Sequence, residues 1–128
     1  MDMHRGFPTD AVIYNRTMRT AQLFVTCLVD TFFPGVGEAA VRVLQRCGVQ
    51  VEFPRGQTCC GQPMFNAGLR GDARRISEHT MKVFERTDGD IVMPSGSCAH
   101  MIRHNYVELF REDEPQRARA ERLAGRTY

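Results

Sequence analysis

Short apolar runs alternate along this chain with longer segments in which apolar residues recur every three or four positions. The run 22–26 (QLFVT) is compact and ends in β-branched residues, which is typical of a buried strand. Residues 49–53 alternate between apolar and polar side chains, and residues 91–93 are continuously apolar. The pattern therefore predicts three short strands, which are spaced widely along the chain.

Amphipathic helices are predicted between and after these strands. Apolar positions recur at helical spacing over 36–47 and over 73–84, with charged residues on the remaining faces. Gly48 gives the first of these helices a stop signal. A third helix is expected over 99–110, and Pro115 fits the first turn of a last, strongly charged helix.

The order of these elements indicates βαβ units, in which crossover helices join parallel strands. We therefore predict an α/β fold, a small three-layer α/β/α domain with a mostly parallel, Rossmann-like sheet. A chain of 128 residues fits one such domain. We assign it to residues 21–128 and treat residues 1–20 as an N-terminal arm of uncertain order.

Composition and charge narrow the function classes. The formal net charge is only +2, which argues against a dedicated nucleic-acid surface. No apolar run approaches the roughly 20 residues that a transmembrane helix needs, and the N-terminus lacks a signal-peptide pattern. We therefore expect a cytoplasmic protein, in which five cysteines indicate metal binding or redox chemistry rather than a disulfide scaffold.

Four of the cysteines are placed where parallel strands end. Cys27 and Cys98 directly follow the first and last predicted strands, and Cys59 and Cys60 occupy the loop beyond the middle one. Because ligands gather at the carboxyl edge of such a sheet, we expect the four sulfurs to converge. They are the candidate ligands of an iron–sulfur cluster.

Two other interpretations of these cysteines stay open at this stage. Structural zinc is one, although the local Cys-x-x-Cys pairs that signal zinc are missing and the site would need long-range assembly. The other is a thiol–disulfide redox sensor built on the neighbouring pair Cys59-Cys60.

Neighbouring residues are expected to stabilise thiolate charge. Gly61 allows a close approach of backbone to an inorganic core, and Gly96 and Ser97 lie at the start of a predicted helix. We predict that these three residues contribute to cofactor binding by hydrogen bonds to sulfur. Cys47 is interpreted differently, as a core residue that completes the apolar stripe of the first helix.

The three cysteine segments carry a family resemblance. Residues 26–30 (TCLVD), 59–63 (CCGQP) and 94–98 (PSGSC), with Asn66 and Gly68, resemble the family of lactate utilisation protein A. More broadly they are similar to the cysteine-rich "CCG" domain found in the glycolate oxidase iron–sulfur protein and in heterodisulfide reductase. The similarity extends from about Ala21 to Tyr128 and covers the N-terminal copy of a domain that these relatives carry twice.

The resemblance implies a [4Fe–4S] cluster and electron transfer within a multisubunit oxidoreductase acting on L-lactate or glycolate. Its implied partners are other subunits of that complex. A surface left by the missing second copy would also be available for self-association. The family pattern ends in Cys-x-x-Cys, whereas this chain has Met101 at the last position, so a fifth thiolate is not expected. His100 is interpreted as a solvated residue.

Overall fold

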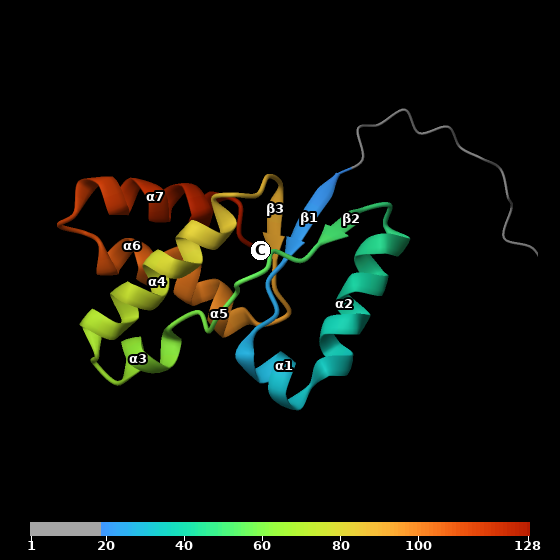
Figure 1. Ribbon diagram of the computed structural model, residues 1–128, viewed down its shortest axis with the longest axis horizontal. Coiled ribbons are helices and arrows are strands. Elements are labelled where there is room, and N and C mark those ends of the chain that lie inside the picture. The colour runs from blue at the N-terminus through green and yellow to red at the C-terminus, as the bar shows by residue number, and fades with distance from the viewer. Residues whose placement is uncertain (1–18) are drawn as a thin grey trace, which may run out of the picture.

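The computed structural model describes residues 19–128, so most of the predicted N-terminal arm lies outside the described residues. Three strands form one parallel sheet: β1 (Thr20–Leu23), β2 (Gln50–Glu52) and β3 (Asp90–Val92). Their order is β2-β1-β3, with β1 in the centre (Figure 1). In register, Ala21 lies opposite Val51 on one side and Asp90 on the other. The parallel sheet that the sequence predicts is confirmed.

Helices connect the strands and follow the last one. They are α1 (Cys27–Phe32), α2 (Pro34–Arg46), α3 (Gln62–Asn66), α4 (Arg70–Phe84), α5 (Gly96–His100), α6 (Tyr106–Leu109) and α7 (Glu114–Gly125). A π-helical segment, η1 (Met101–Asn105), joins α5 to α6. The predicted third helix is therefore one continuous run with a π-helical middle. Pro115 lies in the first turn of α7 as expected, because the missing N–H of proline costs nothing there.

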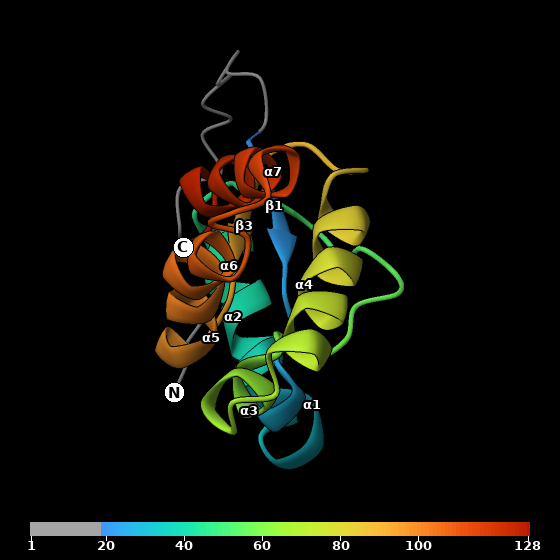
Figure 2. The same ribbon diagram turned by 90° about the vertical axis from the view of Figure 1, so that its left-hand side faces the viewer.

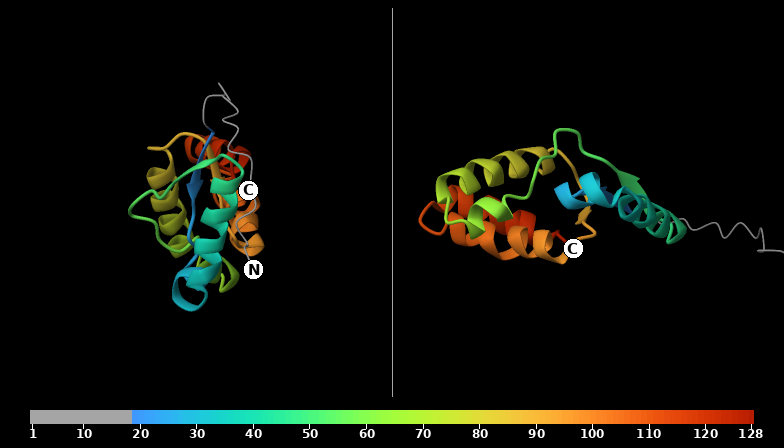
Figure 3. Two further views of the ribbon diagram at one scale, coloured as in Figure 1. Left: turned by 90° about the vertical axis from the view of Figure 1, so that its right-hand side faces the viewer. Right: turned by 90° about the horizontal axis from the view of Figure 1, so that it is seen from below.

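The helices cover both faces of the sheet, as an α/β/α domain requires. Figures 2 and 3 show α4 on one side of β1 and the run from α5 to α6 on the other. The core between them is largely apolar, and the rings of Phe24 and Phe84 stack in it with centroids 5.3 Å apart. The burial of each such side chain stabilises the fold by about 1.5–3 kcal/mol. The apolar core between α4 and the run from α5 to α6 is therefore a main source of stability.

The C-terminal residues extend the sheet beyond β3. The N–H of Tyr128 donates to the carbonyl of Ile91 at 2.7 Å, and the N–H of Met93 donates to Tyr128 at 3.0 Å. An isolated parallel bridge joins Ile91 to Thr127. The chain end therefore covers the outer edge of β3, where unpaired backbone groups would otherwise face solvent.

The prediction that Cys47 is a core residue is wrong. Its side chain is exposed, and Gly37 is the buried residue of α2. Gly37 packs against Val29 of α1, so α2 rests on α1 and β2 through one narrow face. The apolar stripe that ends in Cys47 is only partly covered: Leu44 is half-buried, whereas Val43 is 58% exposed.

Candidate functional site

The three cysteine segments lie at the carboxyl ends of the strands, each at the beginning of a helix. Cys27 is the first residue of α1, and Cys98 lies in the first turn of α5. Cys59 and Cys60 come immediately before Gly61, which caps α3. The three helices begin at this edge for local reasons. Thr26 accepts a hydrogen bond from the N–H of Val29, and Pro63 occupies the first turn of α3.

The structure brings the four thiols together as two pairs. The sulfur atoms of Cys27 and Cys59 are 3.8 Å apart, and Cys60 and Cys98 lie close enough for each thiol to shift the pKa of the other. The pairs also interact with each other, because Cys98 contributes electrostatically to the raised pKa of Cys27, and Cys59 contributes to that of Cys60. All four residues are free thiols.

Burial differs between the members of this thiol group. Cys60 and Cys98 are 2% and 7% exposed and form part of the apolar core. Cys59 is half-buried and Cys27 is exposed. The group therefore has a closed side toward the core and an open side at Cys27, where a bound ion or cluster would meet solvent or a partner.

Each thiol has a hydrogen-bond donor close by in the sequence. The N–H of Gly61 donates to the sulfur of Cys59 at 3.5 Å. Backbone hydrogen bonds from Leu28 and Gln62 lower the pKa values of Cys27 and Cys60, although other effects outweigh them. Hydrogen bonds from the hydroxyls of Ser95 and Ser97 also lower the pKa of Cys98, and here the overall shift is downward.

The sequence interpretation named some of these donors and missed others. It named Gly61 and Ser97, but it missed Leu28, Gln62 and Ser95. Their positions could have indicated this role, because each of them lies within three positions of a cysteine at the beginning of a helix. Backbone N–H groups at the beginning of a helix have no partner within the helix and can donate to sulfur. Gly96 opens α5, and no hydrogen bond from it to sulfur is found in the described part of the chain.

The pKa values of the buried pair move in opposite directions. The hydrogen bond from Cys60, together with those from Ser95 and Ser97, lowers the pKa of Cys98 to about 6. The same hydrogen bond and burial raise the pKa of Cys60 well above its usual range. Burial is the largest cause of the raised pKa of Cys27, followed by its hydrogen bond with Cys59. The lowered pKa favours the thiolate form of Cys98, which is the form that binds metals.

Two residues hold the Cys59-Cys60 loop in place. Gly61 adopts a φ of +92°, and a Cβ added there would lie 3.3 Å from Cγ2 of Ile76, so only glycine fits without strain. The hydroxyl of Tyr106 donates to the carbonyl of Cys60 at 2.7 Å from the opposite side. Tyr106 is fully buried and was not recognised from the sequence as part of the site.

Met101 occupies the position where the family pattern has its last cysteine. Its side chain is fully buried in the core, and the amide of Asn105 lies 3.5 Å from its sulfur. Across residues 19–128, no group of three or more Cys, His, Asp or Glu side chains is close enough to hold a metal ion as placed. The four thiols are therefore neighbours in two pairs, without a preformed cage.

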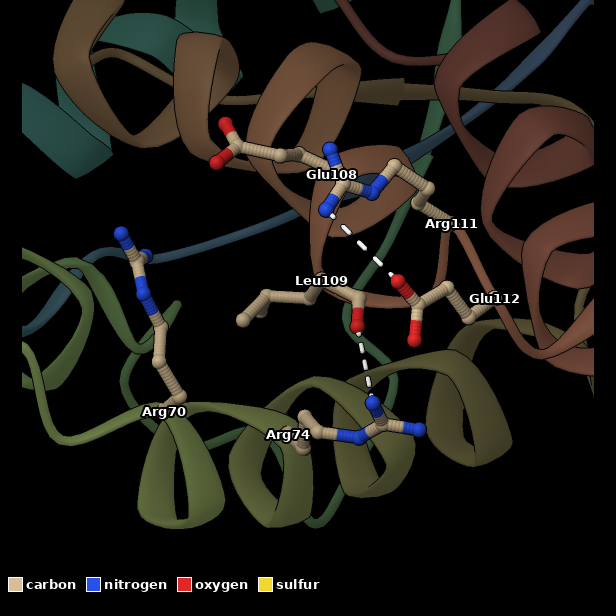
Figure 4. Close-up of a pocket in the computed structure, with 6 residues that line it drawn as sticks. All are labelled: Arg70, Arg74, Glu108, Leu109, Arg111 and Glu112. Atoms are coloured by element: carbon tan, nitrogen blue, oxygen red, sulfur yellow. Dashed lines mark hydrogen bonds and ion pairs between the residues drawn. The ribbon is translucent and has the colours of Figure 1, made fainter.

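A separate hollow of about 260 Å³ lies between α4 and the α6–α7 turn (Figure 4). Three arginines and two glutamates line it, so its charges largely compensate one another. Arg74 donates to the carbonyl of Leu109, and Arg111 pairs with Glu112. These contacts engage two of the three arginines, and none of the cysteines lines the hollow.

A small parallel α/β domain with four thiols at its carboxyl edge defines a cysteine-rich domain of the metal-binding or redox class. The chain belongs to the cysteine-rich CCG domain family, whose model matches residues 21–103. This match includes Cys27, Cys59, Cys60 and Cys98, and it confirms the resemblance found in the sequence.

Several curated relatives are named lactate utilization protein A. The chain is 49% identical over 106 residues to lactate utilization protein A 2 of Bacillus cereus (strain AH820), covering 83% of this chain and 43% of the relative. It is 51% identical over 106 residues to lactate utilization protein A of Shouchella clausii (strain KSM-K16), covering 83% and 44%. The chain thus spans less than half the length of these relatives. No solved structure matches it. In residues 19–128, no helix is both long and apolar enough to cross a membrane.

Proposed function

We propose that this chain is an iron–sulfur electron-transfer domain of a multisubunit oxidoreductase that takes part in L-lactate utilisation. The observation that carries the proposal is the gathering of four free thiols at one edge of a parallel sheet. Thiolates are the usual ligands of [4Fe–4S] clusters, and four of them suffice.

The residues present fit such a group in chemistry. Cys27, Cys59, Cys60 and Cys98 would hold it, and donors from Leu28, Gly61, Gln62, Ser95 and Ser97 would offset the negative charge of the thiolates. The low pKa of Cys98 supplies one thiolate at neutral pH without metal. When bound, a cluster of this kind accepts and releases electrons one at a time.

The link to lactate rests on the relatives. Both are named lactate utilization protein A, and we extend that role to this chain together with its partner subunits. In this proposal the oxidation of the 2-hydroxy acid takes place elsewhere in the complex. A cytoplasmic location keeps the five thiols reduced.

One distance favours zinc as a second candidate. Tetrahedral zinc with Zn–S bonds of about 2.3 Å places its sulfur ligands about 3.8 Å apart. The sulfurs of Cys27 and Cys59 have that spacing. In this alternative the ion is redox-silent and stabilises a domain that binds other subunits.

The thiol–disulfide sensor is less well supported by the contacts. It was based on Cys59 and Cys60 as neighbours in sequence, but each of these thiols is hydrogen-bonded to a different cysteine. A disulfide sensor would instead need Cys27 with Cys59, the more exposed pair.

Metal analysis separates the three candidates. The full chain is purified without oxygen, and iron, acid-labile sulfide and zinc per chain are measured with the visible absorption spectrum. Iron and sulfide in equal amounts with broad visible absorption support the cluster. Stoichiometric zinc without sulfide would overturn it in favour of the interaction domain. Colourless, metal-free protein that loses two thiols on mild oxidation would favour the sensor.

We also propose that the uncovered face beside the thiol group binds a second copy of this chain. Its apolar side chains are Phe32 at the end of α1, 68% exposed, Phe33 between α1 and α2, 61% exposed, and Val43 on α2, 58% exposed. The matched segment is less than half the length of the relatives, so the relatives have room for a second domain. That extra length supports the proposal that a domain packs against this apolar surface.

Sedimentation equilibrium tests this partner proposal. We expect a dimer for the unaltered chain and a monomer for Val43→Glu, because a buried charge at the interface has no partner. Glu38→Gln, on the other side of α2, serves as the matched control and should remain dimeric. A monomer at high micromolar concentration for the unaltered chain would refute self-association.

A further inference from the structure

The structure assigns a second, separate metal-binding function to two histidines, His100 and His104, which form a bidentate site for one divalent transition-metal ion. Their rings lie with centroids 4.7 Å apart and planes inclined at 40°. The two residues are four positions apart, with the π-helical segment η1 between His100 and α6. Both side chains are exposed, in agreement with the interpretation of His100 as a solvated residue.

The spacing of the two rings suits one metal ion. Two histidines at i and i+4 on one helix face are an established way to bind zinc. The nitrogens of two imidazoles on a tetrahedral ion, with bonds of about 2.0–2.1 Å, are about 3.3 Å apart. Rings whose centroids are 4.7 Å apart are close enough for one nitrogen of each to bind the same ion.

The ring nitrogens are available for a ligand. Both side chains are exposed, and in residues 19–128 no hydrogen bond engages either ring. His79 differs in this respect, because its ring lies 2.7 Å from the carbonyl of Gly56. A free pair of imidazoles is the arrangement that metal binding needs, whereas a bonded ring would have to lose its partner first.

Neighbouring charges do not block the site. Arg103, which lies between the two histidines in sequence, turns away and donates to the carbonyl of Thr127 at 2.6 Å. Its guanidinium lies over the ring of Tyr128. The cation nearest in sequence is therefore held on another side of the helix.

This site is distinct from the thiol group. Cys98 is buried and faces the core, whereas His100, two positions later, is exposed. Neutral imidazole suits ions such as Zn²⁺ and Ni²⁺, and it suits Mg²⁺ poorly. Water would complete the coordination, because no third Cys, His, Asp or Glu joins the pair in the described part of the chain.

Nuclear magnetic resonance of the histidine rings tests the assignment, with paramagnetic Ni²⁺ as the probe and the full chain as the sample. The ring signals of His100 and His104 should broaden together, at lower Ni²⁺ than the signal of His79. In His100→Ala and in His104→Ala, the remaining ring should need at least about tenfold more Ni²⁺. Mg²⁺ should have no effect at the same concentrations.

The controls make the result independent of the thiols. All variants carry the same cysteines, so differences between them report the histidine pair whatever the thiol group holds. His79→Ala should leave the broadening of the pair unchanged, and circular dichroism should show that the exposed substitutions keep the helix content. Broadening of one ring that ignores loss of the other, or of both rings no earlier than His79, would overturn the bidentate site.

Discussion

The hydroxyl of Tyr106 donates a 2.7 Å hydrogen bond to the main-chain carbonyl of Cys60, which is 46 positions earlier in the chain. Tyr106 begins α6, behind the thiol group, and is fully buried. The bond therefore ties the last part of the long helical run to the loop that carries two of the four thiols. The Cys60 carbonyl and the tyrosine hydroxyl are both shielded from water. If this hydrogen bond is lost, neither group can form one with solvent instead.

Tyr106→Phe should lower the free energy of unfolding by about 1–2 kcal/mol, because the buried carbonyl of Cys60 loses its donor. The measurement is urea unfolding followed by circular dichroism. Tyr128→Phe is the matched control, since Tyr128 is exposed and loses no buried bond. Equal stability of the two variants would show that the Tyr106 hydroxyl does not support the loop.

Gly61→Ala should destabilise the chain by more than about 1–2 kcal/mol, the usual cost of a left-handed conformation for a residue with a side chain. The added Cβ would also press on Ile76 at 3.3 Å. Gly68→Ala isolates the first effect, because Gly68 has a φ of +77° but open space around its Cβ. Urea unfolding of both variants gives the comparison. A smaller loss for Gly61→Ala than for Gly68→Ala would contradict the crowding at Ile76.

Cys98→Ser should remove most of the bound iron, or the zinc in the alternative, because a serine hydroxyl replaces a thiol whose lowered pKa favours the metal-binding thiolate. Cys47→Ser is the control. Cys47 is exposed and remote from the other cysteines in its contacts, so metal content should persist and stability should change by no more than about 0.5 kcal/mol. Metal analysis of both anaerobically purified proteins decides, and equal metal loss would mean that Cys47 belongs to the site.

Much of the sheet and of the thiol arrangement could be predicted from the sequence, because strand–helix alternation has few parallel solutions. Cys27 and Cys98 follow strands that the apolar pattern marks clearly, and topology then places both at one edge. The pairing of sulfurs could not be predicted. It depends on side-chain directions that are set by Gly61 and by the long-range contact of Tyr106.

The errors have a common physical cause. An apolar stripe shows that a helix face can be buried, but not that another element is present to bury it, and so Cys47 was misplaced. The pairing of Thr127 with Ile91 is likewise a long-range contact that no local pattern marks. The proximity of the His100 and His104 rings depends likewise on side-chain directions, which the four-residue spacing alone does not fix.

Acid should weaken the contact between α4 and α7 through Glu85. The guanidinium of Arg119 donates two hydrogen bonds of 2.6 Å to this carboxylate and lowers its pKa. A lowered pKa in the folded state means that the stabilisation is complete above the unfolded value of about 4.3 and is lost as pH falls through the folded value. Since the Glu85 side chain is 37% exposed, solvent screening limits the contribution to about 1 kcal/mol at most.

Glu85→Gln should therefore be less stable than the unaltered chain at pH 7, and the difference should vanish below the folded pKa of Glu85. Urea unfolding at several values between pH 7 and pH 3 measures it, and high salt should reduce the difference at pH 7. Glu38→Gln is the matched control, because its ion pair with Arg42 is exposed on both sides and contributes little. A difference for Glu85→Gln that persists unchanged at pH 3 would assign the effect to packing instead of charge.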